Sequence, residues 1–173
     1  MEFSEEMIKN AYKKLKSEIY FDKSQLILRD QIVQFESGNI DDILTDLWKN
    51  FNDDIQWEKF EKTLLSSINV LMFPKKISNK KSSITTNSAP KNTTIEEIQY
   101  FIDMNVEAHI LSVLWLLTIG WKLDNETYKH SYGNRIHESL TDEFPNLTYS
   151  PYLFEPYYKQ YEKWLELSFD RSK

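Results

Sequence analysis

The chain of 173 residues contains no cysteine. Disulfides, thiol nucleophiles and thiolate zinc sites are therefore excluded, and the composition fits a reducing cytoplasm. Glycine is also scarce, since the chain has only Gly38, Gly120 and Gly133. Walker and dinucleotide-binding loops need several glycines close together, because the backbone has to curl round a phosphate. Neither kind of loop is expected.

Long hydrophobic runs are missing as well. The longest uncharged stretch lies between Glu107 and Lys122, which is shorter than the roughly 20 residues of a membrane span. We therefore expect a buried helix there and no membrane partner. Residues 1–16 are charged and amphipathic, unlike a secretory signal. The sequence thus predicts a cytoplasmic protein.

Apolar residues recur mostly at helical spacing, and alternating stretches are scattered. The predicted fold class is therefore mainly α: a single helical domain with a few short strands and one long polar loop. Three regions follow one another, an N-terminal helical region (1–74), a basic polar loop (75–94) and a second helical region (95–173).

Individual helices are predicted from their caps and apolar stripes. Ser4 and Asn39 are N-cap candidates, and Thr94 with Glu97 resembles a capping box that opens a helix after the loop. The other helices are expected at about 24–37, 55–71 and 106–119, the last of these ending at Gly120. A terminal helix is expected to open at Pro151 or Pro156.

Charge is unevenly distributed along the chain. The net charge of -6 argues against a generic nucleic-acid coat, but no Asp or Glu occurs between Thr63 and Ile95. Five lysines fall within that interval, at Lys75, Lys76, Lys80, Lys81 and Lys91. Two interpretations stay open at this point: a site for nucleic-acid phosphates, or a solvated lysine loop.

No catalytic or metal-binding constellation emerges from the residues. Asp53-Asp54 superficially resembles a polymerase carboxylate box, but it lies between two helical patterns, where such a pair is a common N-cap cluster. His109, His130 and His137 lack a second ligand at a convincing spacing. We expect His109 to be a core or interface histidine. Neither catalytic nor metal-ligating residues are predicted in this chain.

Aromatic residues are dense near the C-terminus. Tyr157, Tyr161 and Trp164 recur at helical spacing and are interleaved with Lys159 and Lys163. Such rings can stack on nucleic-acid bases, but a stripe at this spacing more often faces the core. A core-facing stripe is the prediction here.

Three motifs in the C-terminal two-fifths carry a resemblance. The first runs from Ile102-Asp103 through Glu107-Ala108-His109-Ile110-Leu111-Ser112-Val113-Leu114-Trp115 and on to Ile119-Gly120-Trp121-Lys122-Leu123-Asp124. The second is Ser131-Tyr132-Gly133-Asn134-Arg135. The third is Leu153-Phe154-Glu155-Pro156-Tyr157-Tyr158-Lys159-Gln160-Tyr161-Glu162-Lys163-Trp164. In this order they resemble the N-terminal fingers region, before the palm, of bacterial reverse transcriptases of the retron-like and defence-associated type.

The resemblance implies a portion of an RNA-directed DNA polymerase, cytoplasmic and involved in anti-phage defence. It implies RNA template, primer and dNTP as ligands of the complete enzyme, with Mg²⁺ as its cofactor, and allows for defence-system partner proteins. Region 95–173 would be fingers-like and lead towards a palm that this chain lacks. Without the palm aspartates, the chain by itself is not expected to polymerise.

The resemblance also assigns roles to individual residues. Tyr132, Gly133 and Arg135 would shape a turn that faces the template or the nucleotide, with the Arg135 guanidinium suited to phosphate. The cations of the loop, Lys75, Lys76, Lys80 and Lys81, would contact the template backbone. The alternative is a free-standing helical binding or adaptor module without enzymatic activity.

Overall fold

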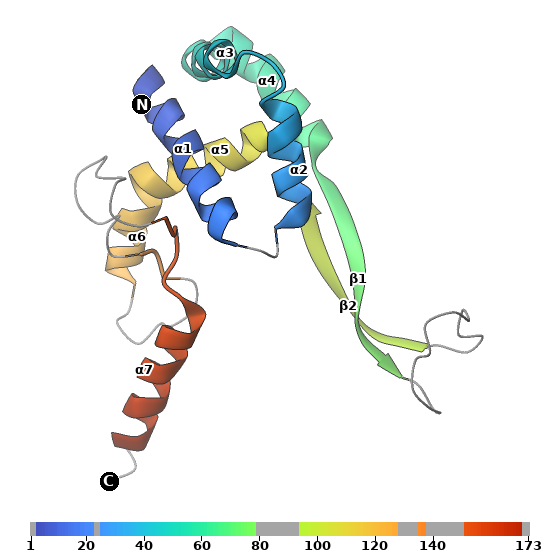
Figure 1. Cartoon of the computed structure of the whole chain (residues 1–173), viewed down its shortest axis with the longest axis vertical. Helices are drawn as coiled ribbons and strands as arrows, with labels where there is room; N and C mark the ends of the chain where they lie inside the picture. The colour runs from blue at the N-terminus through green and yellow to red at the C-terminus, as the bar shows by residue number, and fades with distance from the viewer. Residues whose placement is uncertain (1–2, 23–24, 79–93, 128–134, 138–150, 171–173) are drawn as a thin grey trace.

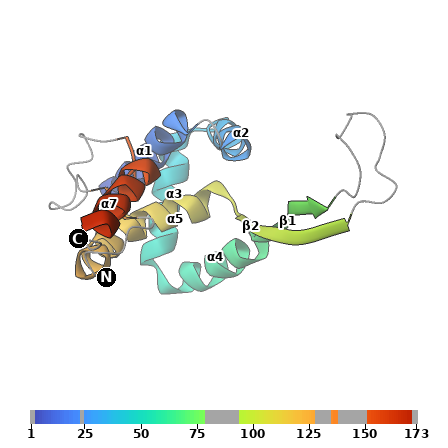
Figure 2. The same cartoon turned by 90° about the horizontal axis from the view of Figure 1, so that it is seen from below.

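The computed structural model describes residues 3–22, 25–78, 94–127, 135–137 and 151–170. The elements run in the order α1 (Glu5–Phe21), α2 (Leu26–Phe35), α3 (Ile40–Asn52), α4 (Asp54–Ser67), β1 (Asn69–Ser78), β2 (Thr94–Asp103), α5 (Val106–Trp115), η1 (Leu116–Gly120), α6 (Trp121–Glu126) and α7 (Tyr157–Asp170). The strands form one antiparallel hairpin that extends away from the helices (Figures 1 and 2). The predicted mainly α fold class is confirmed.

Local capping explains where several helices begin. The Ser4 side chain accepts a hydrogen bond from the Met7 N–H at the start of α1, and the Asn105 side chain accepts one from the Ala108 N–H at the start of α5. Asp53 Oδ1 accepts from the first amides of α4, at 2.9 Å from Gln56 N. Asp53 is therefore an N-cap, as its sequence context predicts.

Helix α1 forms the centre of the hydrophobic core. Its residues Ile8 and Ala11 are fully buried, and so is Ile110 on α5. Helices α2 and α3 add Leu28, Ile32, Leu44 and Leu47 to the same cluster. Arg29 of α2 also donates hydrogen bonds to the carbonyl oxygens of Ile19, Tyr20 and Asp22, which the end of α1 leaves without helical partners.

The hairpin corrects three sequence predictions. Helix α4 was expected to continue to about residue 71 and ends at Ser67, and residues 94–103 form β2 where a capping box predicted a helix. Part of the predicted basic loop, residues 75–78, belongs to β1. The strands are rich in β-branched and aromatic residues, which favour pairing. Pro74 is tolerated because both strands of a two-stranded sheet are edges.

The helix after the hairpin also continues beyond its predicted end. A π-helical turn, η1, replaces the expected termination, and α6 follows directly. A β-carbon at Gly120 would lie 2.9 Å from Cζ3 of Trp115, so glycine lets this ring cover the turn. By length and composition alone the run Val106–Glu126 is long and apolar enough to cross a membrane. A core helix meets the same test, and Ile110, Val113 and Leu114 belong to the core.

Helix α7 opens directly after Pro156, one of the two predicted positions, and extends away from the helical body (Figure 1). The prediction that its aromatic stripe faces the core is wrong. Tyr157 is 76% exposed, and Tyr161 and Trp164 are each 47% exposed. The three rings stack along the helix surface, whereas the Gln160 side chain is buried.

Candidate functional site

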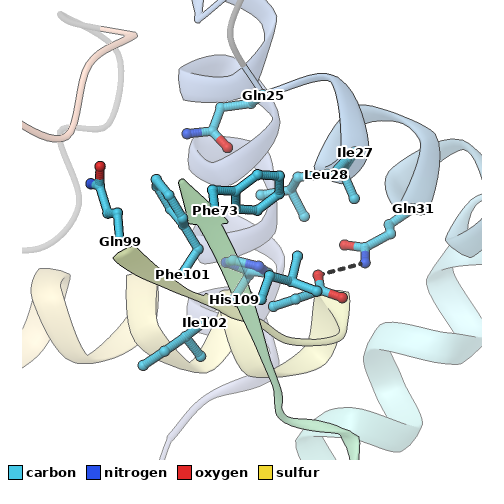
Figure 3. Close-up of a pocket in the computed structure, with 11 residues that line it drawn as sticks. Gln25, Ile27, Leu28, Gln31, Phe73, Gln99, Phe101, Ile102 and His109 are labelled. Carbon is cyan, nitrogen blue, oxygen red and sulfur yellow. Dashed lines mark hydrogen bonds between the residues drawn. The ribbon is translucent and has the colours of Figure 1, made fainter. Parts of the chain in front are cut away.

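A cleft of about 580 Å³ lies where the base of the hairpin meets α2 and α5. Figure 3 shows Phe73 and Phe101 from the two strands opposite Leu28 and Gln31 from α2, with His109 contributed by α5. Phe73 and Phe101 contact each other edge to face, with ring centroids 5.4 Å apart. Volumes of this size are typical of sites for small organic ligands.

The cleft combines apolar walls with polar groups on one side. Gln31 Nε2 donates a hydrogen bond to Asp103 Oδ1 at 3.2 Å (Figure 3). Gln31 Oε1 is buried, yet it has no hydrogen-bond partner among the described residues. A buried acceptor without a partner is uncommon, because it has given up its hydrogen bonds to water. The Asp103 carboxylate, held by the Gln31 amide beside the apolar walls, makes the cleft a candidate binding site.

His109 adds an imidazole to the same surface. Burial lowers its pKa from the ordinary value of 6.5, and the nearby Asp103 carboxylate opposes part of that shift. The neutral form, which has one donor and one acceptor nitrogen, is therefore favoured at neutral pH. The sequence prediction of a core or interface histidine agrees with this half-buried position.

The lowered pKa of His109 predicts how folding stability depends on pH. The unfolded chain protonates His109 at a higher pH than the folded chain does. The stability contributed by neutral His109 is thus fully present above about pH 6.5 and is lost as the pH falls through the lower folded pKa. Replacing His109 with Gln should therefore reduce the loss of unfolding free energy between about pH 7.5 and pH 5.

Urea titrations of the wild type and variants at both pH values measure this effect. Asp103→Asn is the companion variant, because it removes the charge that opposes the shift. It should make the pH dependence steeper than in the wild type. Identical pH dependence in all three proteins would show that His109 is not held in its neutral form.

The two lysines of the predicted phosphate-binding set that the structure describes lie on β1 and are paired with acids of β2. Lys76 Nζ lies 2.8 Å from Glu96 Oε2, and Lys75 Nζ lies 3.4 Å from Glu97 Oε2. Both lysine side chains are more than 60% exposed, and exposed pairs of this kind are weak. The positive charge of these two lysines, which lie in an interval without acids, is thus balanced by acids on the neighbouring strand. Lys80 and Lys81 lie outside the described residues.

Arg135 lies away from the cleft, beside α6. Its Nε is 3.0 Å from Asp124 Oδ1 and 3.1 Å from Asp124 Oδ2, and Nη2 donates to the Asp124 carbonyl oxygen at 2.9 Å. The two side chains are 20% and 16% exposed. The Arg135 guanidinium, which was expected to bind phosphate, is thus paired with a carboxylate here. Tyr132 and Gly133 lie outside the described residues.

The remaining cleft residues escaped sequence analysis. Gln31, Phe73 and Phe101 come from three separate elements, so no local spacing unites them. The alternation of residues 98–102, with Ile98, Tyr100 and Ile102 on one side, was the one signal that could have revealed the strand and hence the cleft.

A divalent metal requires several converging ligands. Within the part of the chain that the structure describes, no three His, Asp or Glu side chains gather in a way that could hold a metal ion. The Mg²⁺ implied by the resemblance therefore finds no set of ligands among these residues.

Comparison of the chain with protein-family models, curated proteins and solved structures gives no match.

Proposed function

We propose that this chain is the N-terminal portion of an RNA-directed DNA polymerase, one that contributes fingers elements facing the template and nucleotide, in an anti-phage defence system of the cytoplasm. Polymerisation then belongs to the complete enzyme, which supplies the palm carboxylates and their Mg²⁺. The motif order Ile102–Asp124, Ser131–Arg135 and Leu153–Trp164 is the observation that carries the proposal.

The spatial arrangement of these motifs supports the proposal. Ile136, directly after the second motif, forms an antiparallel bridge with Phe154 of the third. The Glu155 N–H donates to the Arg135 carbonyl oxygen at 2.8 Å, and Arg135 joins the second motif to Asp124 of the first. Segments that belong to one functional unit are expected to meet in this way.

The third motif is also fixed to the helical body. The Leu153 N–H donates to Glu18 Oε2 of α1 at 2.6 Å. Burial raises the pKa of Glu18, and the Leu153 N–H opposes that shift. The third motif is therefore held against α1, whose residues share one hydrophobic core with α5 of the first motif.

Nucleic-acid binding by the hairpin tests the proposal. We expect weak binding to a primed RNA template that weakens as salt increases, because lysines release counterions when they neutralise phosphates. Replacing Lys75, Lys76, Lys80 and Lys81 with alanine should flatten the salt dependence by up to about 3 log units of affinity per log unit of salt, if each lysine neutralises one phosphate. Fluorescence anisotropy over a salt series measures the slope.

A matched control carries four alanine replacements on α1, α3 and α4, at Lys13, Lys49, Lys59 and Lys62. All four are exposed, and Lys49 and Lys62 are paired with acids as Lys75 and Lys76 are. The control should leave the slope nearly unchanged. No binding at low salt, or equal slopes in both variants, would remove the physical support for a fingers role.

The exposed apolar surface favours the alternative of a binding or adaptor module. Val70, Met72 and Tyr100 of the hairpin are each at least 60% exposed, and exposed apolar patches often mark sites where proteins interact. An adaptor should bind a protein partner through this hairpin and show no salt-dependent RNA affinity. The same anisotropy series therefore separates the two functions.

A further inference from the structure

We propose that the cleft between the hairpin base, α2 and α5 binds a guanine base, with the Asp103 carboxylate accepting hydrogen bonds from its Watson–Crick edge and the Phe73 and Phe101 rings forming the aromatic wall against which the base packs. The inference rests on the proposed function for the class of ligand, a nucleotide. It adds a specific base. It also adds a binding site that contains none of the residues to which the resemblance assigns a role.

Asp103 and Gln31 form one polar corner of the cleft, apart from the amides of Gln25 and Gln99, which also line it. The Asp103 carboxylate offers two oxygens, and Oδ1 accepts from Gln31 Nε2. This hydrogen bond fixes the orientation of the Gln31 amide, because Nε2 is turned to Asp103 and Oε1 is the atom left buried without a partner among the described residues. The Asp103 carboxylate is thus the acceptor that a ligand in the cleft can reach, and a complementary ligand must bring adjacent donors to it.

Guanine has the required donors side by side. Its N1–H and N2–H₂ groups point in one direction from a rigid plane, so a carboxylate can accept from both at once. Adenine, cytosine and uracil each have an acceptor beside their donor on this edge. That acceptor would face an oxygen of the Asp103 carboxylate with no hydrogen between the two atoms, and the two would repel each other. Electrostatics thus favour guanine at this edge.

The walls suit a planar ring. Phe73 and Phe101 are 48% and 46% exposed, so a ligand can reach both rings. Leu28, which is 8% exposed, closes the opposite wall. Stacking on aromatic side chains is the usual way in which proteins hold unpaired bases, and the volume of about 580 Å³ accommodates a nucleoside.

Isothermal titration of the full chain with GMP, IMP and AMP tests the proposal. We expect the order GMP, then IMP, which lacks the N2 amino group, then AMP, with GMP binding at least about tenfold more tightly than AMP. Asp103→Asn should weaken GMP binding by about tenfold or more and leave AMP binding unchanged. Phe101→Leu keeps apolar volume but removes stacking, so it should weaken all three nucleotides.

Asp46→Asn is the matched control. Asp46 is an exposed acid on α3 that lies outside the cleft and is paired with Lys49, and its replacement should change no affinity. Circular dichroism of each variant shows whether the fold is retained. Equal affinities for GMP and AMP, or unchanged GMP affinity in a folded Asp103→Asn protein, would overturn the proposal.

Oligonucleotides identify the source of the base. An adenosine pentamer with one central guanosine should bind more tightly than the all-adenosine pentamer if the base belongs to a single strand, whereas a free nucleotide site should bind GMP but show no difference between the pentamers. Salt-dependent RNA binding without any guanine preference would contradict the guanine site but not the proposed function. If the chain does not bind GMP but forms a dimer that Phe101→Asp dissociates, the cleft binds a second copy of the chain, which would overturn the guanine proposal.

Discussion

Replacing Ile110 with alanine is expected to lower the free energy of unfolding by about 3 to 4 kcal/mol. Ile110 is fully buried on α5 and belongs to the cluster that α5 forms with Ile8 and Leu15 of α1. The substitution removes buried apolar atoms and leaves a space that close-packed neighbours fill only in part. Urea unfolding followed by far-UV circular dichroism measures the change.

Ile55→Ala is the control for this prediction. Ile55 lies in the first turn of α4 and is 84% exposed, so the same substitution should change stability by less than about 0.5 kcal/mol. Similar losses in the two variants would mean that the α1–α5 contact is not the centre of the core. A large loss at Ile110 alone would support the α1–α5 contact as a central part of the core, as the burial pattern indicates.

The ion pair between Arg135 and Asp124 is expected to contribute about 2 to 3 kcal/mol, measured as the cost of Arg135→Ala. Among its effects, the replacement removes two contacts to the carboxylate and one hydrogen bond to the Asp124 carbonyl oxygen. The Asp124 carboxylate, only 16% exposed, would keep its charge in a poorly hydrated place. Asp124→Ala should cost a similar amount for the same reason.

A double-mutant cycle isolates this interaction. If the pair acts as a unit, the double variant should be hardly less stable than either single one, with a coupling energy of about 1.5 to 3 kcal/mol. Arg135→Lys should recover only part of the loss, because an ammonium group cannot reproduce the two-pronged contact. Additive losses would show that the two residues act separately.

The same variants separate a structural role for Arg135 from a role in binding phosphate. Asp124→Ala keeps the guanidinium and removes its carboxylate partner, so a phosphate-binding Arg135 should retain or increase its affinity for nucleic acid in this variant. Arg135→Ala should lose that affinity. If both variants lose affinity in proportion to their loss of stability, Arg135 acts by holding the second motif to α6.

Sequence alone determined the features that depend on near neighbours. The N-caps Ser4, Asn39 and Asp53 each accept a backbone N–H two or three residues further on, and all three were predictable from residue type and the apolar stripe that follows. The burial of Ile8 and Leu15 on α1 follows from the same periodicity. The mainly α class was therefore readable from the sequence.

Tertiary structure decided the features that depend on distant partners. Ile95, Ile98, Phe101 and Ile102 suit a helical stripe as well as a strand, and the pairing of residues such as Ile102 with Val70 settles the choice. The same pairing sets Glu96 beside Lys76 and so balances a charge that looked unopposed. It also brings Phe73, Phe101 and Asp103 to face Gln31.

The exposed stripe of α7 has a related explanation. Periodicity showed that Tyr157, Tyr161 and Trp164 share one face, but which face meets the protein depends on the direction in which the helix leaves the body. That direction is set by the bridge between Ile136 and Phe154 and by the Leu153–Glu18 hydrogen bond. Spacing along a sequence fixes which residues lie together on a helix, whereas only long-range contacts fix what that helix face meets.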